Sequence, residues 1–242
     1  MKKFKCLLTA MLLGCSTMSF AQFMNGGGSS SSSSDNTPWK GLRFSYDRTF
    51  VNIDIDDAPS QDMNGFSLGY VQSFSIAKKL PLFFETGAGI NFARYSDSET
   101  IYGYTISAEN KWSTTTLGLT IPLNVVYKIN INDKLALKPY TGFYLRVNLM
   151  SKSNDKMEVS IPSEFSQYVD ASDYEWDEDY NNFDKDDVGE DGTWNRVQFG
   201  WQIGATLDIN KFNVGIGYAL DFNEIAEKTK CGIFSARLGF NF

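Results

Sequence analysis

The residues from 197 to 209 alternate strictly between apolar and polar side chains. The odd positions are Val197, Phe199, Trp201, Ile203, Ala205, Leu207 and Ile209. The even positions between them are Gln198, Gly200, Gln202, Gly204, Thr206 and Asp208. A period of two puts the two sets on opposite faces of a β-strand, whereas a helix of 3.6 residues per turn would mix them. The fold therefore depends on what covers the apolar face.

Strands of this kind fill most of the chain. Eight are predicted, near 39–47, 65–77, 80–95, 111–131, 134–151, 194–209, 212–222 and 231–242. The connections at 77–81, 131–134 and 210–211 are short, and those around 48–64, 96–110, 152–193 and 223–230 are long. Because short and long connections alternate along the chain, they indicate an up-and-down meander with the short connections at one end and the long ones at the other. The 20 glycines and 6 prolines suit many strands joined by tight turns.

The polar phase of the last three predicted strands carries neither Lys nor Glu, although a solvent-facing surface would be rich in both. Small neutral residues with occasional Arg and Asp are typical of the interior of a narrow closed barrel. The apolar phase carries no charge, as contact with lipid requires. We therefore expect these residues to face lipid: Trp201, Phe212, Val214, Ile216, Tyr218, Leu220, Phe222 and Phe240. A soluble exported barrel or sandwich is the alternative.

The N-terminal segment is typical of export. Residues 1–21 have a basic start, an apolar middle and small residues at Ser19 and Ala21, which predicts a signal peptide cleaved before Gln22. Lipidation at Cys15, within "LLGC", is an alternative. Residues 22–38 are rich in Gly and Ser and are expected to form a flexible tether. After cleavage Cys231 is the remaining cysteine, so no internal disulfide is expected.

The end of the chain resembles a known family. The stretch "FSARLGFNF", with alternating aromatic residues and a terminal Phe242, is similar to the last strand of Gram-negative outer-membrane β-barrels. With the signal peptide and the strands of residues 39–242, it resembles the small porin-family, or outer membrane protein β-barrel domain, proteins. The resemblance implies an eight-stranded antiparallel transmembrane barrel, monomeric, with periplasmic termini. It also implies that outer-membrane lipid surrounds the barrel and that the assembly machinery reads Phe242.

Charged residues also occur on the inward phase. They are Arg43, Asp47, Glu85, Arg146, Arg196, Asp221 and Arg237. An eight-stranded barrel is just wide enough to be filled by its own side chains, so we expect these charges to form two layers of ion pairs that plug the interior. A selective ion path lined by Arg is the alternative.

Residue types that support catalysis are scarce. The chain has no histidine, and the barrel enzymes that it resembles in architecture depend on one as a base or its partner. A single mature cysteine excludes a thiolate zinc site. "TGAGIN", residues 86–91, lacks the third glycine and following helix of a nucleotide site. We therefore expect no enzymatic activity, no cofactor and no nucleic-acid partner.

The connection at 152–193 is strongly acidic. From Asp155 to Asp191 it holds 14 Asp or Glu residues against 2 Lys, with aromatic residues between them. Such a block is usually solvated surface without regular structure. Clustered carboxylates can also hold a divalent cation, and the candidate ligands are Asp177, Asp179, Asp184, Asp186 and Asp187. The string from Asp184 imitates the start of an EF-hand, but Val188 and Asn195 replace two of its ligands. The exposed aromatic residues suggest a third reading, a contact surface for an extracellular partner.

These observations favour a non-enzymatic outer-membrane barrel with a structural or surface-interaction role through its outer loops. A narrow porin-like channel for small solutes or ions is one alternative. An accessory barrel of a secretion or assembly system is another.

Overall fold

The computed structural model describes residues 37–54, 61–77, 80–103, 106–164, 168 and 170–242, so the predicted signal peptide and nearly all of the tether lie outside the described residues. The strands are β1 (Lys40–Ile53), β2 (Met63–Ser75), β3 (Leu82–Tyr102), β4 (Ser107–Tyr127), β5 (Ile129–Asn132), β6 (Leu135–Ser160), β7 (Trp176–Asn181), β8 (Val197–Ile209), β9 (Phe212–Asp221) and β10 (Thr229–Asn241). The helices are η1 (Ala171–Asp173) and α2 (Lys185–Gly192). Neither of these helices is long and apolar enough to cross a bilayer.

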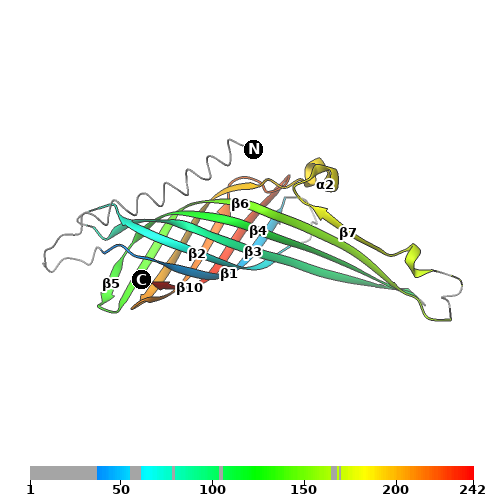
Figure 1. The fold of residues 1–242 in the computed structure, drawn as a ribbon, viewed down its shortest axis with the longest axis horizontal. Coiled ribbons are helices and arrows are strands. Elements are labelled where there is room, and N and C mark those ends of the chain that lie inside the picture. The colour runs from blue at the N-terminus through cyan, green and yellow to red at the C-terminus, as the bar shows by residue number, and fades with distance from the viewer. Residues whose placement is uncertain (1–36, 55–60, 78–79, 104–105, 165–167, 169) are drawn as a thin grey trace. The chain divides into compact units, whose positions relative to one another are not determined.

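Eight of the described strands close into an antiparallel ring, as the alternation predicts (Figure 1). Each pairs with the next along the chain, except that β4 pairs with β6 and β6 with β8, because β5 and β7 are short additions that pair with β6. Pairing of β1 with β10, from Gly41 opposite Asn241 to Ile53 opposite Thr229, joins the first strand to the last. Closure removes both sheet edges, which is what a lipid environment requires of a sheet.

The strands are inclined to the barrel axis. The row of paired residues through Arg48 can be followed both ways around the ring to β6. One way it passes Asn64, Arg94 and Thr115 to Lys152, and the other way it passes Phe234, Tyr218 and Ile203 to Thr141. The two arrivals on β6 are different residues, so the register is staggered and the strands must tilt.

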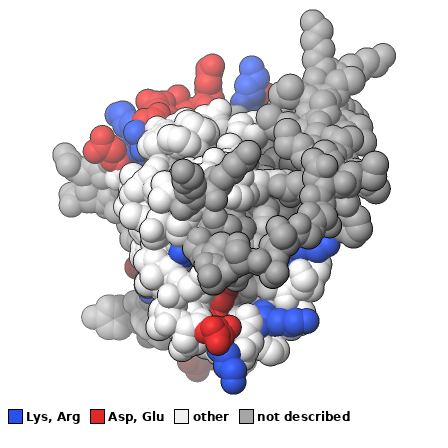
Figure 2. Space-filling view, turned by 90° about the vertical axis from the view of Figure 1, so that its left-hand side faces the viewer, with Lys and Arg blue, Asp and Glu red and all other residues white. Residues whose placement is uncertain are grey.

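The two phases of the strands have opposite surroundings. On the inward phase Gln198 is fully buried and Gln202 is 5% exposed, whereas on the outward phase Ile216 is 59% and Phe212 65% exposed. The polar phase therefore fills the interior and the apolar phase forms the outer wall. In the end view of Figure 2, uncharged residues cover most of the described surface between separate groups of charged ones.

Several strands are longer than the sequence predicts. Strand β1 reaches Ile53, β3 reaches Tyr102, β4 begins at Ser107 and β6 continues to Ser160, so large parts of the predicted connections 48–64, 96–110 and 152–193 are strand (Figure 1). The prediction of long loops here was wrong because it relied on apolar alternation. Outside the bilayer both faces of a sheet can be polar, while the backbone hydrogen bonds continue unchanged.

The acidic segment is also partly ordered, contrary to the expectation of a solvated segment without regular structure. Strand β7 pairs with residues 152–157 of β6. Asp170 caps η1 by accepting a hydrogen bond from the backbone nitrogen of Ser172 at 3.0 Å, and Asp184 caps α2 in the same way from Asp186 at 3.0 Å. Some of its acids are thus helix caps, which satisfy free N–H groups of the first turn.

Candidate functional site

A layer of side chains crosses the base of the barrel, at the end with the short turns. The ammonium of Lys138 lies 2.5 Å from a carboxylate oxygen of Asp208 and 3.7 Å from the centre of the Trp39 ring. The indole nitrogen of Trp39 donates to Glu85 at 2.8 Å. Fully buried Phe83 packs against the same ring, with 4.7 Å between ring centres. A residue that precedes the first strand thus fills the base.

A second polar layer lies nearer the other end. The guanidinium of Arg146 donates to Asp221 at 2.7 Å, and both side chains are almost wholly buried. Tyr144 donates to the other oxygen of Asp221, and Asn148 donates to Gln198 at 2.7 Å. Both carboxylate oxygens of Asp221 thus accept a hydrogen bond, which favours a buried charge pair.

An apolar cap closes over this layer. Its buried residues are Val51, Met63, Ala93, Ile225 and Cys231, and Trp194 packs against them. Ile225 belongs to the connection between β9 and β10, which is held over the opening by a hydrogen bond from the Asn195 nitrogen to the Ile225 oxygen at 2.6 Å. Side chains therefore cross the interior at both ends of the ring.

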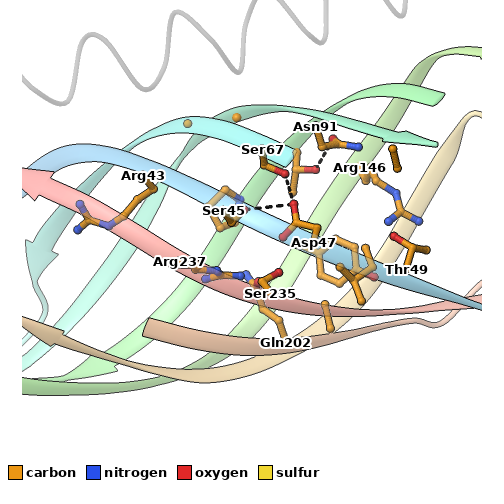
Figure 3. A pocket seen from close by; sticks show the side chains of 18 of the residues that line it. Arg43, Ser45, Asp47, Thr49, Ser67, Asn91, Arg146, Gln202, Ser235 and Arg237 are labelled. Atoms are coloured by element: carbon orange, nitrogen blue, oxygen red, sulfur yellow. Dashed lines mark hydrogen bonds between the residues drawn. The ribbon is translucent and has the colours of Figure 1, made fainter. Parts of the chain in front are cut away.

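Between the layers lies a cavity of about 180 Å³ (Figure 3). Asp47 points into it and accepts hydrogen bonds from Ser45, at 3.1 Å, and from Ser67. Further around the wall, Thr120 donates to Asn91 at 3.0 Å and Gln202 donates to Asn124 at 2.8 Å. Arg43 and Arg237 lie toward one end of the cavity and Arg146 toward the other (Figure 3). Polar and apolar side chains both line the cavity, which is large enough to hold water beside the polar ones.

Two inward tyrosines explain the glycines on the facing strands. A Cβ on Gly217 would lie 2.3 Å from the Tyr140 hydroxyl oxygen, and one on Gly200 would lie 2.5 Å from the Tyr144 hydroxyl oxygen. Each tyrosine ring therefore occupies the space that a side chain larger than hydrogen would need at the facing glycine. This is the close packing that lets an eight-stranded barrel enclose whole aromatic side chains.

The predicted lumen charges are only partly brought together. Arg146 and Asp221 pair directly, whereas Arg43 donates to Asn241 at 2.9 Å and Arg237 lies 5.3 Å from the centre of the Tyr140 ring. Arg196 departs from the prediction. Arg196 precedes β8, which begins at Val197, so the strand does not direct its side chain into the interior. The side chain is exposed, and its guanidinium carbon lies 3.9 Å from the centre of the Phe183 ring.

Three residues at the base of the barrel were missed, namely Lys138, Asp208 and Trp39. The polar phase could have assigned Lys138 and Asp208 to the interior. Their pairing depends on the strand register, which sets Lys138 opposite Thr206, beside Asp208. Trp39 lies within the predicted strand 39–47, but the alternation gives no partner for its ring. It is held at the base because the Ser73 nitrogen donates to the Trp39 oxygen at 2.8 Å and the Trp39 nitrogen donates to the Ser73 hydroxyl oxygen at 2.7 Å.

Four of the five candidate metal ligands accept hydrogen bonds from nearby residues. Asp177 and Asp179 accept from the same Asn154 amide nitrogen at 2.8 and 3.0 Å, and Asp187 accepts from the Asn181 backbone at 2.8 Å. Asp184 caps α2, and Asp186 lies in its first turn. Within the described ranges, no group of three or more Asp, Glu, Cys or His side chains is placed to hold a metal ion.

The residues predicted to face lipid lie on the outer wall. Phe212, Val214, Ile216, Tyr218, Leu220, Phe222, Phe240 and Phe242 are between 38% and 65% exposed. Trp201 is half-buried because its indole nitrogen donates to Thr141 on the neighbouring strand at 2.9 Å. Phe143, Phe199 and Phe222 form an aromatic group on the same wall, with ring centres 5.4 to 6.3 Å apart.

A closed antiparallel ring with a polar interior and an apolar outer wall defines a transmembrane β-barrel. Residues 20–227 match the family model of the outer membrane protein beta-barrel domain, and the chain belongs to this family. Its location is therefore the outer membrane. No curated protein sequence matches the chain.

Solved structures with a similar fold include Ail, the attachment invasion locus protein of Yersinia pestis, at 15% identity, covering 84% of this chain and 98% of that chain with a TM-score of 0.33. Neisserial surface protein A is 12% identical, with 84% and 97% covered and a TM-score of 0.40. The outer membrane enzyme PagL is 10% identical, with 82% and 98% covered and a TM-score of 0.36.

Proposed function

We propose that this chain is a non-enzymatic outer-membrane barrel that binds an extracellular partner through the sheet that extends beyond its ring. The observation that carries the proposal is the contrast between a filled interior and an extended exterior. Layers that contain Lys138 with Asp208 and Arg146 with Asp221 cross the lumen. Solute passage would have to displace these buried groups, whereas the extended strands are open to solvent.

We call the extension the projecting sheet: residues 95–102 of β3, 107–114 of β4, 153–160 of β6, and β7. Its strands remain paired to their ends, with Tyr102 opposite Ser107 and Ser107 opposite Ser160. On one face, Lys111 bridges Glu109 at 3.1 Å and Glu158 at 2.6 Å. These charge pairs and the continuous ladder favour an ordered surface rather than a loose loop.

Large aromatic residues are exposed on and near the projecting sheet. Tyr102 is 82% exposed, Tyr168 77%, Tyr174 59% and Trp176 42%. Tyr and Trp combine a large apolar surface with a polar atom and are enriched in protein interfaces. Interleaved carboxylates such as Asp177 would favour a partner that presents cationic or hydroxyl groups. This chemistry supports a recognition role for the projecting sheet.

The orientation belongs to the same proposal. Short turns of outer-membrane barrels face the periplasm and long connections face outward. The described ends of the chain lie together and with the short turns, since the Phe242 nitrogen donates to the Lys40 oxygen at 3.0 Å and the Asn241 nitrogen donates to the oxygen of Lys211, in a short turn, at 2.7 Å. Both termini would then be periplasmic, with Phe242 available to the assembly machinery and the projecting sheet outside the cell.

Cysteine labelling on intact cells tests the orientation. Cys231 is buried, so a Tyr102→Cys variant adds one accessible thiol at the tip of the projecting sheet. We expect a membrane-impermeant maleimide to label Tyr102→Cys on intact cells, and the matched variant Lys134→Cys, in a short turn, only after lysis. Labelling of Lys134→Cys alone on intact cells would reverse the orientation and remove the proposed binding surface.

A narrow channel is the second candidate, because the cavity between the layers has a volume of about 180 Å³ and is lined in part by charged side chains such as Arg43, Asp47 and Arg237. Single-channel recording in planar bilayers separates the two functions. The filled interior predicts no reproducible conductance steps for the wild-type protein. Regular steps of open-pore size would favour transport and reject the recognition proposal in its present form.

A further inference from the structure

Three outward-facing cations lie on one row of paired residues near the outer rim. The row runs from Arg48 on β1 through Asn64 and Arg94 to Thr115 and Lys152 on β6. The cations occupy alternate strands of this row, so neighbouring ones are about 10 Å apart across the sheet. Arg94 and Lys152 are exposed, and the side chain of Arg48 is 52% exposed.

Each cation is the first charged position beyond the apolar stripe of its strand. Two residues closer to the short-turn end, the outward side chains are Tyr46 on β1 and Phe92 on β3, 40% and 43% exposed. Phe66 on β2 lies between them and meets Tyr46 edge to face, with 5.7 Å between ring centres. Aromatic residues in this position mark the level of lipid headgroups on a membrane barrel.

The charge of the row is only partly balanced. Arg48 donates to Asp62 at 3.0 Å. Among the residues that the structure describes, Arg94 and Lys152 have no ion pair. Cations that are held at headgroup level beside an apolar wall attract anionic lipid, and a phosphate can accept several charge-assisted hydrogen bonds from Arg.

We propose that Arg48, Arg94 and Lys152 form a binding surface for phosphorylated lipid headgroups of the outer leaflet. The lipid chains would lie on the apolar wall below the row while the phosphates contact the cations. A lipid with more than one phosphate fits best, because it can contact two cations of the row at once. The surface is separate from the projecting sheet. It rests on the proposed orientation of the barrel but not on the recognition role proposed for the projecting sheet.

The probe is lipid A, a bisphosphorylated glycolipid, titrated onto the full-length protein in detergent micelles and followed by native mass spectrometry. We expect binding to weaken roughly fivefold for each cation removed in the series Arg48→Gln, Arg94→Gln and Lys152→Gln. It should also weaken when the salt rises from about 0.05 M to about 0.5 M. Monophosphorylated lipid A should bind less tightly than the bisphosphorylated form.

Matched variants test whether position matters and not net charge alone. The triple variant Lys40→Gln, Lys134→Gln, Lys211→Gln removes the same charge at the short-turn end and should leave binding unchanged. Asp62→Asn frees Arg48 from its carboxylate and should strengthen binding. Heat-modifiable gel migration shows which variants are folded, and the single Arg94→Gln and Lys152→Gln variants replace the triple if it does not fold.

Equal affinities of the two triple variants would overturn the proposal. So would complete displacement of the lipid by inorganic pyrophosphate at equimolar concentration, because the row would then be a site for free anions and not for a lipid. The proposal would also be overturned if Arg94→Gln and Lys152→Gln each bound lipid A as tightly as the wild-type protein does.

Discussion

The ammonium group of Lys138 lies 3.7 Å from the centre of the Trp39 ring inside the base of the barrel. Lys138 is 3% exposed and also contacts Asp208 at 2.5 Å. A buried ammonium is stable only when it is paired, and an indole face supplies favourable electrostatic contact in addition to the carboxylate. Trp39 therefore has a part in keeping a charge inside the barrel.

Replacing Trp39 should destabilise the barrel. We expect Trp39→Ala to lower the free energy of unfolding by about 3 kcal/mol, since it removes ring packing and exposes Lys138. Trp39→Phe keeps an aromatic face and loses the hydrogen bond to Glu85, so its loss should be about 1 kcal/mol. Urea unfolding in lipid vesicles measures both, and equal losses for the two variants would contradict this role of the ring.

The pair of Arg146 and Asp221 should behave as one unit. Because Asp221 would be left charged and unpaired, Arg146→Ala is expected to destabilise the barrel by about 3 to 5 kcal/mol. The double variant Arg146→Met with Asp221→Leu removes both charges and fills the space, so it should be much closer to wild type. Additive losses in a double-mutant cycle would show that the two residues act independently.

Gly217 should tolerate no side chain while Tyr140 is present. Gly217→Ala is expected to destabilise by about 1 to 3 kcal/mol, because its Cβ would lie 2.3 Å from the Tyr140 hydroxyl oxygen. Tyr140→Phe removes that oxygen, which has no hydrogen-bond partner among the described residues, and should rescue the alanine variant. Gly192→Ala, whose nearest contact would be 3.5 Å, is the control. The same urea titration measures all four variants, and failure of the Tyr140→Phe substitution to rescue would place the clash elsewhere.

The projecting sheet should loosen in acid. Hydrogen bonds from Lys111 and then Lys156 lower the pKa of Glu158 from its usual 4.5 to about 2. A folded-state pKa below the unfolded value means that this contribution is complete above pH 4.5 and is lost as the pH falls toward 2. Cleavage of the projecting sheet by pepsin over this range should therefore rise more steeply in wild type than in Glu158→Gln, where the group cannot titrate. High salt should reduce the difference, since the group is exposed.

The period-two pattern predicts much of the fold because lipid and lumen select opposite residues on each strand. The inward direction of Gln202 and the outward direction of Ile216 follow from that pattern alone. Within the candidate site, the pattern also assigns Arg146 and Asp221 to the interior. Counting from the short turns places both in the upper of the two predicted layers, but which members of a layer pair directly depends on the register between strands.

What the sequence by itself determines is the local alternation, and through it the strands, their faces and the membrane class. The tertiary structure decides the rest, since pairing register and ring closure depend on all strands together. They set Lys138 beside Asp208 and bring Trp39, which precedes the first strand, into the base. They also carry β3, β4 and β6 past the bilayer, where backbone pairing persists although the alternation that marks a lipid-facing strand has ended.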